Sequence, residues 1–269
     1  MMTAPNQPHA LLYLWESRTL YIGELFELPS IRTAAAVLIF GLEKPFFIQE
    51  LTSGASGVET RSALVSAGAK VHVDSRGQIM AAVFLDPFGR DFRSLKPQMK
   101  KRLADTWVDS GDEDRQLKVL QRIYHDIVAM QTTYDFLLKD ILPSKTPRDD
   151  SNEVDARLLQ VVACIKDDPA SNESNQVLAS KVGMSESQLQ RQFKQVIGIP
   201  LRRYRLWHRL FVTAGYMALG NNITDAALAA GFSDSSHFSR TFRNMLGMTP
   251  SFVFQRHSRI LINPESRSG

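Results

Sequence analysis

Short runs of apolar or alternating residues, separated by turn-forming residues, fill the first ninety positions of the chain. Runs of this length that are bounded by Gly, Pro, Ser and Asp predict β-strands. Seven such runs with short connections favour an antiparallel barrel or sandwich over a parallel sheet, and we expect an antiparallel β-barrel. The runs are ALLYLW, TLYIGELFEL, AAAVLIF, PFFIQEL, SALVSAG, KVHV and QIMAAVFLDP.

The spacing of apolar positions becomes helical after residue 90. Residues 91–107 are rich in lysine and have helical spacing, and residues 112–141 place apolar residues at steps of three and four along one stripe. This stripe could pack on the barrel, pair with its copy in a second subunit, or do both. We therefore expect a homodimer, and the residues assigned to its contact are Leu120, Tyr124, Ile127, Tyr134 and Leu138.

A polar segment, PSKTPRDDSN, divides the chain in two. It contains two prolines, two serines, four charged residues and no apolar residue, which is typical of a linker between domains. We assign residues 1–142 to the barrel with its amphipathic helices, 143–152 to the linker, 153–257 to a helical domain and 258–269 to a flexible tail. The expected fold class is α+β with more than one domain.

Charge also separates the two parts of the chain. The 269 residues have a formal net charge of +4. Residues 1–151 hold 18 Lys and Arg against 19 Asp and Glu, whereas residues 152–269 hold 14 against 9. A basic domain joined to a near-neutral one is typical of a module that binds phosphate groups, although a solvated surface could carry the same surplus.

Three features bear on the expected compartment. The longest apolar run, AAAVLIFGL, is about half the roughly 20 residues that a membrane-spanning helix needs. The start of the chain, MMTAPNQPHA, has neither the basic region nor the apolar core of a signal peptide. The one cysteine, Cys164, cannot form an internal disulfide, which fits a reducing compartment. We expect a cytoplasmic protein without a membrane segment.

One motif occurs twice in the basic part of the chain. The first copy, residues 178–200, is LASKVGMSESQLQRQFKQVIGIP, and the second, residues 226–250, is AALAAGFSDSSHFSRTFRNMLGMTP. Each copy predicts a helix, a tight turn and a second helix. Gly183 and Gly231 permit the turns, and the apolar residue that follows each glycine fills the corner between the helices.

The second helix of each copy has an apolar face and a polar face. Ser185 is the expected N-cap of the first of these helices, with Gln188 completing a capping box, and Ser233 or Asp234 is the expected N-cap of the other. The polar faces carry side chains that donate to base edges and phosphates, so we expect them to face DNA. The predicted DNA-facing residues are Ser187, Gln190, Arg191, Lys194, Ser235, Ser236, Ser239, Arg240 and Arg243.

A third helix is predicted between the two copies, from Leu201 to Leu219. At 1.5 Å per residue it spans roughly 28 Å, and two recognition helices on one face of B-DNA enter major grooves about 34 Å apart. The arginines of this helix are candidates for phosphate contacts, although some could instead pair with carboxylates of the first domain. The phosphate candidates are Arg202, Arg203 and Arg205.

Residues 153–256 resemble the DNA-binding domain of the AraC/XylS transcription regulators. The most specific part is ITDAALAAGFSDSSHFSRTFRNMLGMTP, which is similar to that family's second helix-turn-helix. Thr213 stands where many members have alanine. The resemblance implies a seven-helix domain that binds promoter DNA with both helix-turn-helix motifs. It also implies contacts with RNA polymerase, and a cupin-like N-terminal barrel that binds an effector and dimerises.

No residue pattern in the first domain identifies the effector. Arg61, His72 and Arg76 could contact an anionic effector, or they could be ordinary surface or paired residues on strands. A cupin metal site would need two closely spaced histidines and a carboxylate, and the segment VHVDSRG offers His72 alone. We therefore expect no metal and no cofactor.

The expected function is sequence-specific DNA binding by a transcriptional activator that a small molecule in the N-terminal domain controls. One alternative is a ligand-independent regulator whose N-terminal domain only dimerises or binds a protein partner. A further alternative is an enzyme on the barrel that is targeted to DNA. The sequence has no nucleophile elbow, metal triad, Gly-rich phosphate loop or Cys/His pair, so we expect no enzyme.

Overall fold

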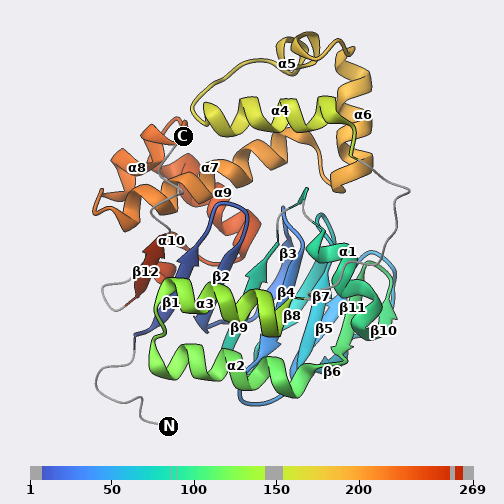
Figure 1. The fold of residues 1–269 in the computed structure, drawn as a ribbon, viewed down its shortest axis with the longest axis vertical. Helices are drawn as coiled ribbons and strands as arrows, with labels where there is room; N and C mark the ends of the chain where they lie inside the picture. The colour runs from blue at the N-terminus through green and yellow to red at the C-terminus, as the bar shows by residue number, and fades with distance from the viewer. Residues whose placement is uncertain (1–7, 86, 89, 143–153, 255–257, 263–269) are drawn as a thin grey trace.

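The computed structural model describes residues 8–85, 87, 88, 90–142, 154–254 and 258–262. Figure 1 shows a β-sheet domain with two helices across one of its faces, and a helical domain above it. Within the described residues, no helix is both long enough and apolar enough to cross a membrane.

The strands of the first domain form two separate sheets. One has eight strands in the order β10-β11-β7-β4-β9-β2-β1-β12, and the other has four in the order β3-β8-β5-β6. The strands are β1 (Ala10–Leu14), β2 (Thr19–Glu24), β3 (Leu28–Arg32), β4 (Val37–Gly41), β5 (Phe46–Glu50), β6 (Val58–Thr60), β7 (Ser62–Val65), β8 (Lys70–Asp74), β9 (Ile79–Phe84), β10 (Met99–Leu103), β11 (Thr106–Ser110) and β12 (Arg259–Ile262).

The structure confirms the seven predicted strands, which are β1, β2, β4, β5, β7, β8 and β9. It corrects the predicted cupin-like barrel, because the end strands of the two sheets do not pair and the ladder of strands does not close. Strands β5 and β8 alternate between buried and half-buried residues, as expected for a sheet with one face on a core. Strands β1 and β4 are buried at every residue because both of their faces are covered.

The structure also corrects the helix expected at residues 91–107. A short helix α1 (Asp91–Leu95) and a 3-10 turn η1 (Lys96–Gln98) are followed by the antiparallel hairpin of β10 and β11. Lys101 and Arg102 are exposed on β10, which is the last strand of the eight-stranded sheet. Charged side chains are common on edge strands because they discourage pairing with another chain. The basic residues that suggested a helix therefore mark a sheet edge.

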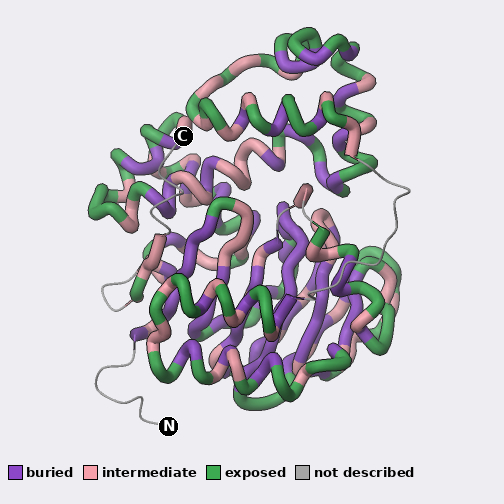
Figure 2. The backbone as a smooth tube through the Cα atoms, in the orientation of Figure 1, coloured by how far each residue is buried: buried purple, intermediate pink, exposed green. Residues whose placement is uncertain are grey.

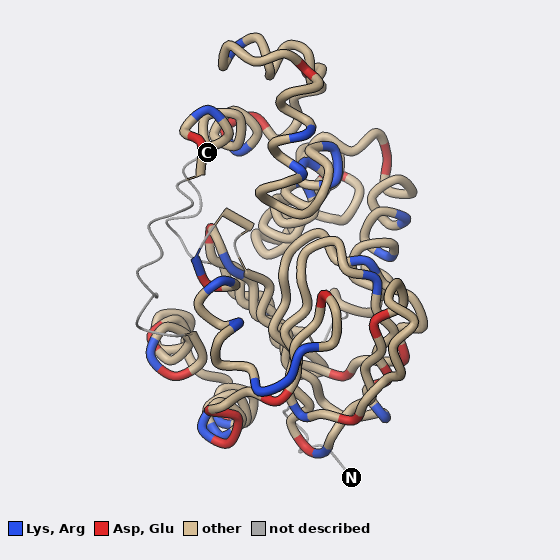
Figure 3. Tube along the Cα trace, turned by 90° about the vertical axis from the view of Figure 1, so that its right-hand side faces the viewer, with Lys and Arg blue, Asp and Glu red and all other residues tan. Residues whose placement is uncertain are grey.

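The long helix expected at residues 112–141 is interrupted. Helix α2 (Glu113–Asp126) ends at Ile127, whose φ of 50° is left-handed. Helix α3 (Met130–Phe136) then continues into a π-helical turn η2 (Leu137–Ile141), which folds back onto α2. Figure 2 shows that both helices keep exposed outward faces while the strands behind them are buried. Acidic and basic residues both occur on these faces (Figure 3).

This hairpin of helices alters the expected dimer contact. Leu120 and Tyr124 are 0% and 6% exposed and pack in the same cluster as the strands of the eight-stranded sheet. Ile127 and Tyr134 are half-buried, and Leu138 is 39% exposed. In the single chain, Leu120 and Tyr124 therefore pack on the sheet, which is one of the two uses expected for the stripe. A dimer contact through the stripe stays a prediction.

The strand β12 corrects the expected flexible tail. Residues 259–262 pair in parallel with β1, from Leu11 opposite Arg259 to Leu14 opposite Ile262. Without β12, strand β1 would present unpaired peptide groups at the edge of the sheet. Ile260 and Ile262 also pack against an apolar cluster that includes both domains. The expected linker at residues 143–152 lies outside the described residues.

Seven helices form the described part of the second domain, residues 154–254, as the resemblance implies. They are α4 (Ala156–Asp167), α5 (Asn175–Lys181), α6 (Glu186–Ile197), α7 (Leu201–Ala218), α8 (Ile223–Ala229), α9 (Ser235–Leu246) and α10 (Pro250–Val253). The helix expected between the two repeats is α7. The paired helices of the repeats are α5 with α6 and α8 with α9.

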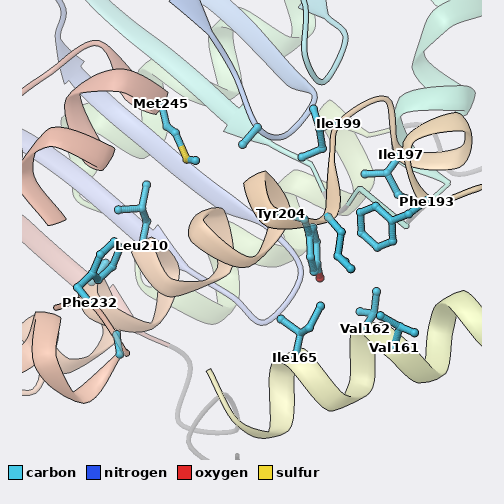
Figure 4. Packing of buried hydrophobic residues seen from close by; sticks show 14 of the residues in the cluster. Val161, Val162, Ile165, Phe193, Ile197, Ile199, Tyr204, Leu210, Phe232 and Met245 are labelled. Carbon is cyan, nitrogen blue, oxygen red and sulfur yellow. The ribbon is translucent and has the colours of Figure 1, made fainter. Parts of the chain in front are cut away.

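The helical domain and the sheet domain share one apolar core. Figure 4 shows Val162 and Ile165 of α4 pointing toward Tyr204 of α7. The same cluster includes Leu14 of β1 and Tyr21 of β2. Burial of apolar surface between the domains therefore holds the helices against the sheets.

Candidate nucleic-acid interface

The first helix-turn-helix follows the geometry that its sequence predicts. Gly183 has a φ of 66°, which favours glycine, and Met184 behind it is 6% exposed. The hydroxyl of Ser185 accepts a hydrogen bond of 3.2 Å from the backbone N–H of Gln188. Helix α6 ends at Gly198, whose φ of 84° is again left-handed. The turn and both ends of the recognition helix are thus fixed locally.

The second helix-turn-helix repeats this construction with a different cap. Gly231 has a φ of 89°, and Phe232 is 3% exposed at the corner. Of the two candidates for the cap, the structure selects Asp234, whose Oδ1 accepts a 2.7 Å hydrogen bond from the backbone N–H of His237. That hydrogen bond and one from Ser233 lower the pKa of the Asp234 carboxyl. The cap therefore carries its charge at the start of α9, where the helix dipole favours it.

The inner faces of α6 and α9 are buried. Leu189 and Phe193 of α6 are both 0% exposed, and Phe238 and Phe242 of α9 are 0% and 3% exposed. This anchoring turns the opposite faces outward. The predicted DNA-facing residues that are exposed are Ser187, Gln190, Arg191, Lys194, Ser236, Arg240 and Arg243, and those that are half-buried are Ser235 and Ser239. Their contact with DNA stays a prediction.

The long basic side chains on these faces are largely unengaged. Within the described residues, the side chains of Arg191, Lys194 and Arg243 make no hydrogen bond or ion pair with another residue. Gln190 donates a 2.8 Å hydrogen bond to Glu186 on its own helix. Free guanidinium and ammonium groups on two matched helices are available to an outside acceptor such as a base edge or a phosphate.

The three predicted phosphate contacts lie in different surroundings. Arg202 is exposed. Arg203 donates to the backbone oxygen of Arg32 in the sheet domain, and burial lowers the pKa of its guanidinium. Arg205 donates to the backbone oxygens of Ser171 and Glu173 at 2.5 and 2.6 Å. Because Arg203 and Arg205 already have acceptors inside the chain, Arg202 is the residue of the three that best fits a phosphate contact.

Arg209 has a structural role that the sequence did not reveal. It is 8% exposed, and its guanidinium donates to the backbone oxygens of Pro169, Ser171 and Gly231 at 2.8, 2.9 and 2.6 Å. It also donates to Asn172 Oδ1 at 3.1 Å. Arg209 thus ties the loop before α5 to the turn of the second helix-turn-helix. Sequence reasoning treated it only as one more positive charge on α7.

The predicted effector residues make contacts within the sheet domain. Arg61 donates to the backbone oxygens of Gly41 and Leu42, and Nε2 of His72 lies 3.0 Å from Glu27 Oε1. Arg76 pairs with Glu59 and Asp74. None of Arg61, His72 and Arg76 lines the apolar cavity described below. The structure therefore favours the interpretation that these are paired surface residues. Within the described chain, no group of three or more His, Cys, Asp or Glu could hold a metal ion.

An apolar cavity of about 50 Å³ lies between the two sheets, and we call it the inter-sheet cavity. Its walls come from strands of both sheets, and Leu246, the last residue of α9, and Met248, two residues beyond it, close the cavity. The complete lining is Tyr21, Leu25, Leu28, Ile31, Thr33, Val37, Ile39, Val71, Val73, Met80, Ala82, Phe84, Leu246 and Met248. The second recognition helix therefore contributes directly to a cavity of the sheet domain.

Comparison with known proteins matches residues 178–256 to a family model described as a helix-turn-helix domain. Over 165 residues the chain is 29% identical to the HTH-type transcriptional activator RhaS of Citrobacter koseri. This aligned region covers 61% of this chain and 56% of the relative. Over 103 residues it is 35% identical to RhaS of Escherichia fergusonii, covering 38% and 37% respectively. The chain thus matches about half or less of the length of these relatives.

Solved structures of ToxT from Vibrio cholerae are similar over most of the chain. An apo form of a ToxT variant superposes with a TM-score of 0.57 at 14% identity and covers 89% of this chain and 97% of that one. ToxT described as bound to an unsaturated fatty acid gives a TM-score of 0.54 at 14% identity, covering 87% and 94%. At this identity the likeness concerns the fold, a two-sheet domain followed by helix-turn-helix helices.

Proposed function

Because this chain belongs to the AraC/XylS family of helix-turn-helix transcription regulators, we propose that it activates transcription from a specific promoter site under the control of a small-molecule effector. The family consists of transcription regulators and not enzymes, which removes the hypothesis of an enzyme built on the sheet domain. The observation that carries the proposal is the pair of matched recognition helices with exposed and largely unengaged polar faces.

Sequence reading is assigned to the outer faces of α6 and α9. The two helices would enter successive major grooves on one side of the duplex, with α7 between them. A helix of the 18 residues of α7 is about 27 Å long at 1.5 Å per residue. Arg191 and Arg240 are the longest side chains at the expected base-facing positions, and arginine pairs in a bidentate manner with the O6 and N7 atoms of guanine.

Orientation on the duplex is assigned to the remaining basic residues. Lys194, Arg202 and Arg243 are exposed, and contacts of such residues with phosphates carry affinity but no sequence information. Each phosphate that is neutralised releases counterions, so binding should weaken steeply as salt is raised.

The effector is assigned to the inter-sheet cavity. Its lining is apolar apart from Thr33 and the Tyr21 hydroxyl, which favours an apolar ligand or tail over the anion that Arg61, His72 and Arg76 suggested. A ligand there would press on Leu246 and Met248 and so move the end of α9 relative to α6. The fatty-acid complex of ToxT, which has the same fold, supports this class of effector.

Activation through RNA polymerase is proposed from the activator RhaS, to which the DNA-binding part is similar. A second candidate function remains, a ligand-independent regulator whose sheet domain only dimerises or binds a partner. The small size of the inter-sheet cavity, about 50 Å³, favours this second candidate unless the sheets separate on binding.

Footprinting of the full-length chain on the DNA that flanks its own gene tests the proposal, with and without oleate as a probe for an unsaturated fatty acid. The expected result is a protected site that covers two adjacent major-groove segments and changes in extent or affinity with oleate. Protection that is the same on unrelated DNA would refute specific reading. A specific footprint that does not respond to oleate or to other apolar ligands would favour the ligand-independent candidate.

A further inference from the structure

One edge of the sheet domain concentrates positive charge. Residues 90–102 hold six basic residues and one acidic residue, whereas residues 1–151 as a whole hold 18 basic and 19 acidic residues. We call the six residues the basic edge, and all of them are exposed: Arg90, Arg93, Lys96, Lys100, Lys101 and Arg102. Six of the 18 positive charges of a near-neutral domain therefore lie between the start of α1 and the end of β10.

The acidic residues nearby leave most of this charge uncompensated. Asp91 accepts hydrogen bonds of 2.6 and 3.0 Å from Arg18, so its charge is already paired inside the sheet domain. Asp105, in the turn that follows β10, adds one exposed carboxylate. Within the described residues, the side chains of Lys100 and Lys101 make no hydrogen bond or ion pair. Protection of an edge strand from pairing accounts for charges on β10, but not for those on α1 and η1.

Trp107 holds two of the basic side chains in place. Lys96 Nζ lies 4.9 Å and Arg102 Cζ lies 5.3 Å from the centre of the Trp107 ring. Nε of Arg102 also donates a 2.8 Å hydrogen bond to the backbone oxygen of Ala104. A cation over an aromatic ring keeps its charge, and a side chain that is already ordered loses less conformational entropy when it binds. The basic edge is therefore a partly preorganised surface for an anion.

The basic edge lies next to the first recognition helix. A groove of about 540 Å³ is lined by Arg93 and Asp105 of the sheet domain and by Gln195 in the last turn of α6. Gln195 is exposed and follows Arg191 by four residues, so the two side chains lie on the same side of α6. Helices α6 and α1 and strand β10 lie along the right-hand side of Figure 1, and Lys and Arg follow one another below the helical domain on that side in Figure 3. The basic edge thus begins beside the helix face that we assign to DNA.

We propose that the basic edge contacts the phosphates of DNA beside the segment that α6 reads. Duplex DNA carries a negative charge about every 1.7 Å along its axis, so it offers successive partners to a row of cations. Contacts of this kind add affinity and fix the orientation of the protein without reading bases. The inference rests on the proposed function, because it takes α6 as a DNA-reading helix, and it extends the interface to the sheet domain. A shift of the sheet domain relative to α6 would then change the number of phosphate contacts.

Gel-shift titration of the full-length chain on the footprinted site, repeated from about 50 to 200 mM salt, tests the proposal. The variant Lys100→Gln/Lys101→Gln removes two exposed charges from the basic edge. Its matched control, Lys44→Gln/Lys118→Gln, removes two exposed lysines from other parts of the sheet domain, so the two variants have the same net charge. Each lost phosphate contact lowers the slope of log affinity against log salt by about 0.9. We expect the slope to fall by about 1.8 in the first variant and to stay unchanged in the control.

Hydroxyl-radical footprinting locates the contacts on the duplex. The half of the site that α6 reads is the half where Arg191→Ala weakens protection. The unaltered chain should also protect sugars just outside that half, and Lys100→Gln/Lys101→Gln should lose this outer protection while both halves stay protected. A slope and a protected length equal to those of the control would overturn the proposal and would leave the basic edge to a partner other than DNA.

Failure of the proposed function itself would give a different result. If the unaltered chain protects no specific site, the same two variants are compared on an unrelated duplex, which phosphate contacts also bind. A smaller slope for Lys100→Gln/Lys101→Gln than for the control would then support the phosphate contacts although specific reading had failed, and equal slopes would overturn them. Both variants should melt at the same temperature by circular dichroism, because exposed substitutions of this kind change stability little.

Discussion

Gly198 and Gly247 end the two recognition helices in the same left-handed conformation, with φ of 84° and 75°, and each lies against the sheet domain. A Cβ atom on Gly198 would lie 3.0 Å from the backbone oxygen of Ala67, and one on Gly247 would lie 2.5 Å from Leu28 Cδ2. The sheet domain therefore contacts both recognition helices, α6 and α9, at equivalent positions. A change in the sheets can alter the spacing of the readers without passing through α7.

Replacing Gly247 by alanine should separate backbone strain from this contact. A left-handed residue with a Cβ is unfavourable by about 1–2 kcal/mol, and Gly247→Ala should add the displacement of Leu28. The matched control is Gly183→Ala, because Gly183 has a φ of 66° and nothing within 4 Å of the added atom. Urea unfolding should show a larger loss for Gly247→Ala, and equal losses would mean that the contact contributes nothing.

Removing either of the long side chains at the expected base-facing positions should weaken specific DNA binding. Arg191→Ala and Arg240→Ala should each lose about 1–3 kcal/mol if each guanidinium makes a bidentate base contact. Gel-shift titration on the footprinted site at fixed salt measures the change. Arg122→Ala, which removes an exposed arginine of α2 that pairs with Asp126 and lies over the Phe136 ring, is the control. Operator affinity that matches the control would refute the assignment.

Replacing Arg209 by alanine should destabilise the helical domain. The change leaves the backbone oxygens of Pro169 and Gly231 and the Asn172 side chain without this donor, while Ser171 keeps its hydrogen bond from Arg205. We expect a loss of about 2–4 kcal/mol in the free energy of unfolding. Arg202→Ala, on the exposed side of the same helix, should stay within about 0.5 kcal/mol. If the stability of Arg209→Ala matched that of Arg202→Ala, the tie between the two helix-turn-helix units would not matter for folding.

The cap at Asp234 should make the stability of α9 depend on pH. Its pKa in the folded chain lies below the usual value of 3.8, so its contribution is complete above that value and is lost as the pH falls through the folded pKa. Asp234→Asn keeps an acceptor for the His237 N–H but does not titrate. The melting temperature of the unaltered chain should therefore fall more between pH 5 and pH 3 than that of Asp234→Asn. If the two melting temperatures fall equally over this range, the charge of Asp234 does not stabilise α9.

A dimer contact through the hairpin of α2, α3 and η2 should involve Leu138 of η2 and not Leu120 of α2. Leu138→Glu places a charge on an exposed position and should yield a folded monomer by light scattering, provided that the chain dimerises there. Leu120→Glu buries an unpaired charge beneath the sheet and should unfold the domain. A Leu138→Glu variant that is still a dimer would place the contact elsewhere.

Much of the helical domain is determined by the sequence itself. The glycine at each turn, the apolar residue after it and the inward residues four positions apart are local requirements. The repeat therefore predicted α5, α6, α8 and α9, the cap of α6 at Ser185 and a cap of α9 at Ser233 or Asp234. The same holds for the seven strands that alternate or run apolar between turn residues. An element can be predicted from the sequence where the role of each residue depends on its near neighbours in the chain.

Tertiary structure decided what depends on distant segments. Three features depend on which apolar surface the rest of the chain leaves exposed. They are the failure of the strands to close into a barrel, the break at Ile127 and the pairing of β12 with β1. No pattern of neighbouring residues predicts them. The arginines of α7 show the same division. Their charge was visible in the sequence, but only the folded chain turns Arg203, Arg205 and Arg209 toward backbone oxygens and leaves Arg202 facing outward, because burial forces a guanidinium to take its acceptors from whatever segments the fold brings beside it.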